Sequence, residues 1–120
     1  MRILLADGGA STRFALCTLL EQNPQWCVVG EISTATELEE RISNNHVDVL
    51  LLDWSLPGLN GCETVPAIKQ NFPKLGLIIL SGRPELKNTA CTAGADAFVS
   101  KTEPPDRLLA TISKFSSQGG

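Results

Sequence analysis

The stretch that decides the fold is VDVLLLD, residues Val47–Asp53, in which four consecutive apolar residues lead directly to an acid. Such an unbroken apolar run is typical of a central strand in a parallel sheet, because helices cover that strand on both faces. The turn-rich segment WSLPGLNG, residues 54–61, follows it. The sequence therefore predicts a buried strand over Val47–Leu52, with Asp53 at its carboxyl end.

Shorter apolar runs on either side of this strand alternate with helical patterns. We expect strands over 2–6, 27–32, 76–80 and 97–100, and helices over 10–23, 35–44, 62–71, 84–94 and after the prolines at 104 and 105. Ser33 or Thr34 is expected to cap the second helix, with Glu37 three residues after Thr34. This strand–helix alternation predicts an α/β domain with a parallel sheet and helices on both faces.

Composition excludes several classes of protein. A chain of 120 residues is expected to form one domain, and its net charge of −3 leaves no basic excess for holding a nucleic-acid backbone. Its apolar runs are too short to span a bilayer. The four cysteines lack the spacing of a zinc site or a redox pair. We therefore expect buried free thiols and a reducing compartment, the cytoplasm.

Candidate chemistry lies at the ends of the predicted strands. Asp7, Asp53, Ser81 and Lys101 follow the first, third, fourth and fifth strands, and the carboxyl ends of parallel strands meet at one edge. Carboxylates bind Mg²⁺, whereas hydroxyl and ammonium groups bind phosphate oxygens. Asp53 is the natural nucleophile, because a carboxylate can accept a phosphoryl group as an acyl phosphate. Taken singly, each residue has a structural alternative, since an acid at a strand end is often only a turn former.

The chain resembles a response-regulator receiver domain, and is most similar to those of LuxR/NarL-type transcription factors. Residues 47–61 follow the family pattern D-V-(apolar)₃-D-x-x-(apolar)-P-x-x-(polar)-G, and further similarity lies at 2–7, 77–82 and 93–101. The resemblance implies a (βα)5 flavodoxin-like, doubly wound sheet with strand order 2-1-3-4-5. It also implies a receiver domain over 1–116 and a tail or linker over 117–120.

The resemblance assigns a role to each candidate residue. Asp53 is expected to accept a phosphoryl group from a phosphohistidine donor, which is a sensor histidine kinase or a histidine phosphotransfer protein. Lys101 is expected to contact the phosphoryl group. Ser81 corresponds to the switching hydroxyl residue, and Phe98 to the aromatic residue whose rotamer reports the switch. The resemblance therefore implies a domain that accepts a phosphoryl group and at most removes it again by its own hydrolysis. No other enzymatic activity is expected.

The metal site implied by the resemblance is incomplete in this sequence. Asp7, Asp53 and the backbone carbonyl of Ser55 are expected to hold Mg²⁺. Gly8, however, stands where the family has the acid that touches the metal directly. Losing one carboxylate near a divalent cation weakens binding by one to a few orders of magnitude, since a unit charge at 4 Å contributes up to about 4 kcal/mol. Thr102 replaces a proline that often follows the lysine through a cis bond, so this loop is either trans or strained.

Three functions remain to be compared. The first is a phosphorylation-gated receiver that acts on DNA only through an output domain outside this chain. The second is a receiver-like interaction or dimerisation module that works without phosphorylation, with Mg²⁺ binding weakened by Gly8. The third, a phosphatase with an aspartate nucleophile, is disfavoured because Ser55 stands where the second acid of its D-x-D motif would be. The resemblance also allows a homodimer. Phe14, close to the active edge, is either packed at the rim or a docking residue for the histidine-containing partner.

Overall fold

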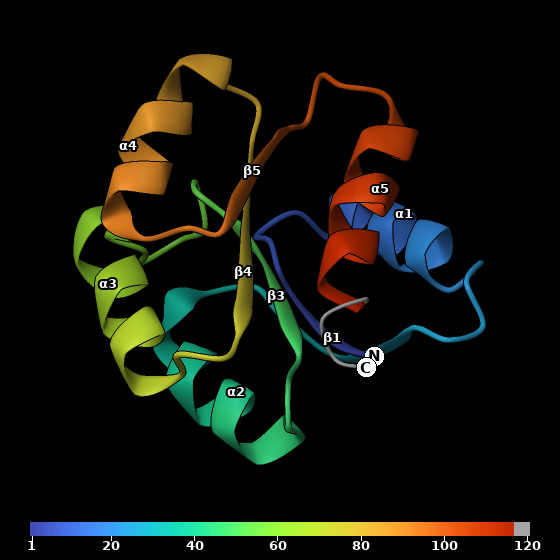
Figure 1. Cartoon of the computed structure of the whole chain (residues 1–120), viewed down its shortest axis with the longest axis horizontal. Helices are drawn as coiled ribbons and strands as arrows, with labels where there is room; N and C mark the ends of the chain where they lie inside the picture. The colour runs from blue at the N-terminus through green and yellow to red at the C-terminus, as the bar shows by residue number, and fades with distance from the viewer. Residues whose placement is uncertain (117–120) are drawn as a thin grey trace.

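The computed structural model describes residues 1–116, and the expected tail at 117–120 lies outside the described residues. Five parallel strands form one sheet in the order β2-β1-β3-β4-β5 (Figure 1), which confirms the predicted fold class. The strands are β1 Arg2–Ala6, β2 Cys27–Ile32, β3 Val49–Asp53, β4 Gly76–Ser81 and β5 Ala97–Ser100. The helices are α1 Ala10–Leu20, α2 Leu38–Asn45, α3 Gly61–Asn71, α4 Lys87–Ala93 and α5 Pro105–Ser116, with short 3-10 turns at Ala35–Glu37 and Pro84–Leu86.

The sheet is covered on both faces, as the apolar third strand predicts. Side chains alternate along β3, so Leu50 and Leu52 face the cluster beneath α2, α3 and α4, whereas Val49 and Leu51 face the cluster beneath α1 and α5. The two helix layers can be followed in Figure 1. All five residues of β3 are buried. Burial of these four aliphatic side chains contributes about 1.5–3 kcal/mol each, which makes β3 the centre of the core.

Strand register brings the functional edge together. Ala6 pairs with Leu52, Asp53 with Leu80, and Ser81 with Ser100. Four adjacent strands therefore end at nearly the same level. The residues at or just beyond these ends occupy one rim of the sheet.

The end of the first helix and the start of the second differ from the expected ones. α1 ends at Leu20 rather than at residue 23, because Gln22 and Asn23 donate to the carbonyls three residues earlier and tighten the chain into turns. The region of the second helix opens as a 3-10 turn, and no side-chain cap forms there. Instead, the Thr34 hydroxyl hydrogen-bonds the Thr36 hydroxyl at 3.0 Å. The predicted cap at this helix is therefore wrong, because a neighbouring hydroxyl competes for the capping oxygen.

The expected burial of the cysteines is also wrong. Cys27, Cys62 and Cys91 are exposed free thiols, and Cys17 is half-buried. Apolar neighbours in the sequence do not decide which side of an edge strand or helix a residue occupies. Burial, and next the charge of Glu31, raise the pKa of the Cys17 thiol to about 11, so this thiol stays protonated at neutral pH. Within residues 1–116, no helix has the length and apolar character needed to cross a membrane.

The last helix packs closely against the sheet where the Phe115 ring lies over Gly76. A Cβ atom at this position would lie 2.6 Å from the Phe115 ring. We therefore expect Gly76→Ala to lower the free energy of unfolding by about 1–3 kcal/mol, the usual cost of overpacking a core. Urea unfolding followed by tryptophan fluorescence measures this change. Adding Phe115→Leu, which removes the opposing ring, should recover part of the loss, and an unfolding curve for Gly76→Ala that matches the native curve would contradict the packing argument.

Candidate functional site

Asp53 ends β3 at the rim of the sheet. The residue is buried, with 7% of its surface exposed, so only a small part of it reaches solvent. Its Oδ1 atom accepts a hydrogen bond from the backbone N–H of Ser55 at 3.0 Å, and its Oδ2 atom lies 3.2 Å from Nζ of Lys101. The carboxylate is therefore held in one orientation, with a cation at its side.

Asp7 follows β1 and is fixed by four hydrogen bonds. Its Oδ1 atom accepts from the Gly9 N–H at 2.8 Å, and its Oδ2 atom accepts from Nζ of Lys101 at 2.7 Å. Its backbone N–H donates to the carbonyl of Ile32, and its own carbonyl accepts from the Arg13 guanidinium at 2.7 Å. The side chain is nearly buried. Asp7 therefore has little freedom to change its orientation.

Lys101 joins the two acids. It follows β5, and its backbone N–H donates to the carbonyl of Ser81 at 2.8 Å, which aims the side chain across the strand ends toward Asp7 and Asp53. Desolvation by burial is the largest single influence on the pKa of Lys101 and lowers it. The hydrogen bond to Asp7 and the charges of both acids outweigh that effect and raise the pKa above its ordinary value. The ammonium is therefore charged throughout the neutral range.

Ser81 and Phe98 lie on the neighbouring strands β4 and β5. Ser81 ends β4, one residue beyond the partner of Asp53, and is buried. Its Oγ atom accepts a hydrogen bond from the Arg83 N–H at 3.0 Å, which leaves the hydroxyl hydrogen available for donation. Phe98, in β5, is half-buried and packs against the core cluster beneath α2, α3 and α4. The structure thus brings Asp7, Asp53 and Lys101 into contact and sets Ser81 next to them.

The two loops that flank the site take defined forms. Ser55 is exposed, and its N–H turns back to Asp53. All described peptide bonds are trans, which decides the alternative left open at Lys101 and Thr102. Ser100 Oγ lies 2.7 Å from Thr102 Oγ1 and accepts from the Thr102 N–H at 3.2 Å. This hydroxyl turn orders the loop without a proline at position 102.

Asp7 and Asp53, the two carboxylates expected to hold Mg²⁺, both lie against the Lys101 ammonium. Receiver domains in general use Mg²⁺ for phosphorylation. Among residues 1–116, however, no group of three or more His, Cys, Asp or Glu side chains gathers in a metal-binding arrangement. The two acids at the rim already share the Lys101 ammonium, and a Cβ atom at Gly8 would lie 2.7 Å from Cδ of Pro57. A metal here would meet a fixed positive charge and only two carboxylates.

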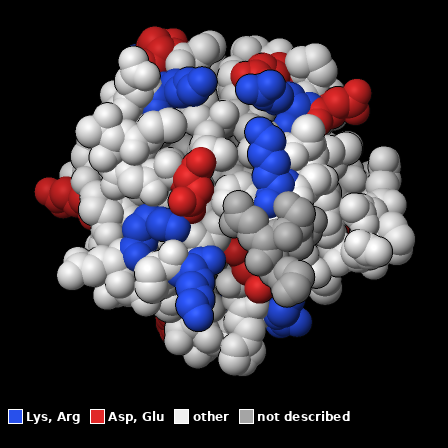
Figure 2. Space-filling model, in the orientation of Figure 1, with Lys and Arg blue, Asp and Glu red and all other residues white. Residues whose placement is uncertain are grey.

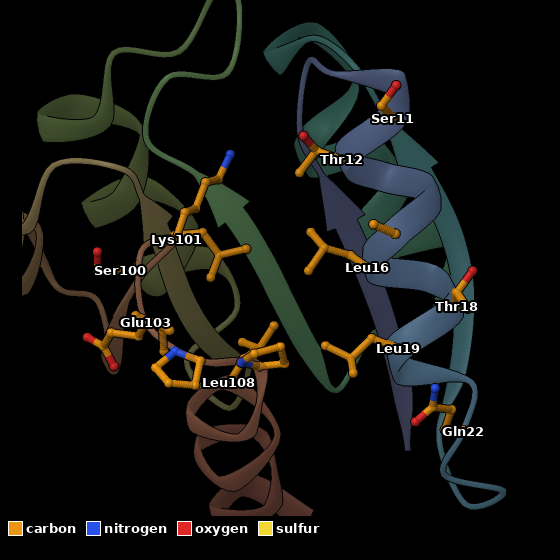
Figure 3. Close-up of a pocket in the computed structure, with 15 residues that line it drawn as sticks. Ser11, Thr12, Leu16, Thr18, Leu19, Gln22, Ser100, Lys101, Glu103 and Leu108 are labelled. Carbon is orange, nitrogen blue, oxygen red and sulfur yellow. The ribbon is translucent and has the colours of Figure 1, made fainter.

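A groove beside the site was missed by sequence reasoning. It has a volume of about 690 Å³ and runs between α1 and the start of α5, with Lys101 at one end (Figure 3). Leu16, Leu19 and Leu108 supply apolar walls. The sequence signals were the proline pair at 104–105 and the small residues along α1. Phe14 projects from the same helix and is 75% exposed, so it is not packed at the rim.

The central ion cluster should govern stability at this edge. We expect Lys101→Met to lower the free energy of unfolding by about 1–3 kcal/mol at neutral pH, because two nearly buried carboxylates lose their counter-charge. Solvent screens part of this interaction, because the lysine side chain is 32% exposed, and the expected loss of stability is smaller for that reason. Lys101→Arg, which keeps the charge, should lower the free energy of unfolding by a smaller amount.

The effect of this lysine should also depend on pH. Folding raises the pKa of Lys101, so its contribution is complete below the ordinary lysine pKa and disappears as the pH rises through the raised value. Urea unfolding of the native chain and Lys101→Met, from neutral to strongly alkaline pH, measures the difference. If the difference in unfolding free energy between the two proteins grew as the pH became alkaline, the raised pKa of Lys101 in the folded state would be contradicted.

Comparison with known proteins agrees with this geometry. A sequence model of the response regulator receiver domain matches residues 3–113. The nitrate/nitrite response regulator protein NarL of Escherichia coli K12 is 30% identical over 112 residues, which are 92% of this chain and 52% of NarL. The response regulator UvrY of the same strain is 31% identical over 121 residues, 98% of this chain and 56% of UvrY. The chain spans about half the length of these curated relatives.

Solved structures share the fold. The isolated REC domain of RcsB from Salmonella enterica serovar Typhimurium, determined in the presence of the phosphomimetic BeF3⁻, has a TM-score of 0.83 at 27% identity and matches over 95% of this chain and 88% of its own. A LuxR-family two-component response regulator from Aurantimonas sp. SI85-9A1 has a TM-score of 0.88 at 27% identity, over 97% of this chain and 85% of its own. This chain therefore belongs to the response-regulator receiver domain family, and its homologues are regulators of the LuxR/NarL type.

Proposed function

We propose that this receiver domain accepts a phosphoryl group on Asp53 from a sensor histidine kinase or a histidine phosphotransfer protein. One observation carries the proposal. The carboxylate of Asp53 reaches the rim of the sheet with Nζ of Lys101 at 3.2 Å, so an acceptor oxygen and a cation for the incoming charge stand side by side. Phosphoryl transfer depends mainly on positioning and charge neutralisation of this kind.

The transfer follows from the contacts at Asp53. A carboxylate oxygen of Asp53 forms a bond to phosphorus, and the bond between phosphorus and the donor's imidazole nitrogen breaks, with the electron pair leaving on the imidazole. The Lys101 ammonium then donates one of its hydrogen bonds to a phosphoryl oxygen instead of to one of the two acids. The Ser81 hydroxyl, whose oxygen already accepts from the Arg83 N–H, uses its hydrogen to donate to a second phosphoryl oxygen. The product is an acyl phosphate that at most hydrolyses slowly in the same site.

The conformational signal would pass along β4 and β5. Movement of Ser81 toward the phosphoryl group changes the space beside β5, where Phe98 is half-buried and can repack. Phosphorylation then shifts a pre-existing equilibrium between two arrangements of this region rather than building a new one. Ser81 and Phe98 are the switch residues in this proposal.

Features of the surface support the proposed partners. Phe14, which is exposed on α1, and the apolar groove that α1 lines next to Lys101 (Figure 3) are surfaces to which the histidine-containing partner would dock. Lysine and arginine are interspersed with acids on the described part of the face in Figure 2, so this face presents no continuous basic stripe for DNA. Action on DNA would therefore pass through an output domain like those of DNA-binding relatives. We further propose a cytoplasmic location, and a homodimer remains compatible with this surface.

The arrangement of charges at the rim favours a second function. Two acids that share the single Lys101 ammonium, with a glycine in the third acidic position, are also what a phosphorylation-independent interaction module would contain. In that case the domain would bind a partner or dimerise in one permanent arrangement. Asp53→Asn separates the two functions, because it removes the acceptor while keeping the size of the side chain.

Phosphorylation can be measured directly by intact mass. We expect the native chain, exposed to a small phosphoryl donor in the presence of Mg²⁺, to gain the mass of one phosphoryl group, because the acceptor oxygen stands beside Lys101. Asp53→Asn is the matched control and should gain none. An unchanged native mass, together with partner binding that Asp53→Asn leaves unaltered, would favour the phosphorylation-independent module. An equal gain in both proteins would place the acceptor elsewhere.

Docking through Phe14 can be tested separately from chemistry. We expect Phe14→Ser to slow transfer from a phosphohistidine protein by about tenfold, the effect of losing roughly 1.4 kcal/mol of contact energy. Transfer from the small donor should be unchanged, since Phe14 is not among the residues that contact Asp53. Rates followed by intact mass with each donor measure the difference. Equal rates with the protein donor would show that docking does not use this residue.

A further inference from the structure

We infer that Arg13 is a positioning residue for phosphoryl transfer, because it holds the backbone of Asp7 in place ahead of two glycines and so fixes the carboxylate that Lys101 contacts. Sequence reasoning missed this arginine, since it lies inside α1 rather than at a strand end. Its effect on transfer rests on the proposed function. Its effect on the geometry of the rim does not, and can be measured separately.

The Arg13 guanidinium bridges the backbone of Asp7 and strand β2. Its Nη1 atom donates to the Asp7 carbonyl at 2.7 Å, and its Nε atom lies 3.4 Å from Oε1 of Glu31. The Asp7 N–H donates to the carbonyl of Ile32, the last residue of β2, at 3.1 Å. The Arg13 side chain is 19% exposed, so the guanidinium is largely withdrawn from solvent. Both polar groups of the Asp7 backbone are therefore tied to the end of β2, one directly and the other through Arg13 and Glu31.

The chain that follows Asp7 has little stiffness of its own. Gly8 and Gly9 come next, and glycine loses more conformational freedom on folding than any other residue. Gly9 precedes the first turn of α1, where no side chain caps the helix. Its N–H instead donates to Asp7 Oδ1 at 2.8 Å. The hydrogen bonds of Asp7, including the one from Arg13, therefore supply the order that the two glycines lack.

The position of Arg13 is unfavourable for α1 itself. The first turn of this helix holds no acid, and a cation near a helix N-terminus opposes the helix dipole. The charged partner of Arg13 is Glu31 on β2, and not an acid one turn away on α1 that would support the helix. The stability of α1 therefore does not account for this arginine, whereas its contact with the Asp7 carbonyl does.

The orientation of Asp7 reaches the phosphoryl acceptor through Lys101. Asp7 Oδ2 accepts a hydrogen bond from Nζ of Lys101 at 2.7 Å, and the same nitrogen lies 3.2 Å from Asp53 Oδ2. A rotation of the Asp7 backbone would move its carboxylate, and with it the ammonium that faces the acceptor. Within residues 1–116 no ion pair joins Arg13 to Asp53, so the influence of Arg13 passes through Asp7. Transfer reactions are sensitive to displacements of about 1 Å, so this influence is large enough to change the rate.

Amide hydrogen exchange followed by NMR tests the geometry without any phosphoryl donor. The Gly9 N–H reports whether the Asp7 carboxylate stays in place, because the two are hydrogen-bonded. We expect Arg13→Gln to speed exchange at Gly9 by at least about tenfold relative to the amides of β3 and of the middle of α1. Those reference amides report global unfolding and fraying of the helix.

Two further variants sharpen the exchange measurement. Arg13→Lys keeps a charged donor and should recover part of the protection at Gly9. Arg107→Gln is the matched control, since it removes an exposed arginine that pairs with Glu103 on the far side of the lysine loop, and should leave Gly9 unchanged. Exchange at Gly9 that stays at the native rate in Arg13→Gln, or that rises only in step with the reference amides, would overturn the inference.

Transfer kinetics test the consequence for the chemistry. With a small phosphoryl donor and Mg²⁺, we expect Arg13→Gln to lower the maximal rate of mass gain by about tenfold and to leave the donor concentration at half-maximal rate unchanged. Glu31→Gln should have a smaller effect, because the Glu31 side chain is 46% exposed. In an Asp7→Ala background, Arg13→Gln should slow transfer little further, since the carboxylate that it positions is gone.

The two measurements separate a failure of this inference from a failure of the proposed function. A native chain that gains no phosphoryl mass would contradict the proposed function, and exchange at Gly9 would then decide the geometry alone. A native rate of transfer in Arg13→Gln would overturn the role of Arg13 in transfer. An equal slowing with and without the Asp7 carboxylate would also overturn it, because the arginine would then act by another route.

Discussion

The ammonium of Lys101, between the carboxylates of Asp7 and Asp53, is the interaction on which this rim of the protein depends. Asp7 and Lys101 are 94 residues apart in the chain, and their hydrogen bond links the first strand to the last. Without this cation, two nearly buried carboxylates would face each other across adjacent strand ends, which costs several kcal/mol when no charge compensates them. The same cation stands where a phosphoryl group on Asp53 would need one. Stability and candidate chemistry therefore rest on one side chain.

The second constraint is the packing of loops around that cluster. The segment 54–60 leaves β3, folds back through the Ser55 N–H onto Asp53, and is anchored by buried Leu56 and by the Ala35 hydrogen bond. This anchoring brings Pro57 against Gly8. The loop that carries Ser55 and the loop that carries Gly8 therefore pack together at the same rim as Asp53 and Lys101.

Several features were accessible from sequence because they depend on local or periodic patterns. The apolar run before Asp53 predicts a strand covered on both faces, and strand–helix alternation places the candidate residues at one rim. Other features depended on competition between neighbours. The capping oxygen of Thr34 was taken by the Thr36 hydroxyl, and Cys27, Cys62 and Cys91 turned outward despite apolar neighbours. Sequence patterns record which residues are near in the chain, but not which of two available partners a side chain will choose.

By itself, the sequence determined the order of strands and helices and the presence of an acid, a hydroxyl and an amine at successive strand ends, because hydrophobic periodicity and parallel winding leave few other arrangements. Only the tertiary structure decided what these groups touch. It decided that Lys101 joins both acids, that the loop after it is trans, that Phe14 points into solvent, and that the space beside Gly8 holds a proline ring. Those outcomes depend on distances of a few ångströms between loops far apart in the chain, and such distances are set by the packing of the whole domain.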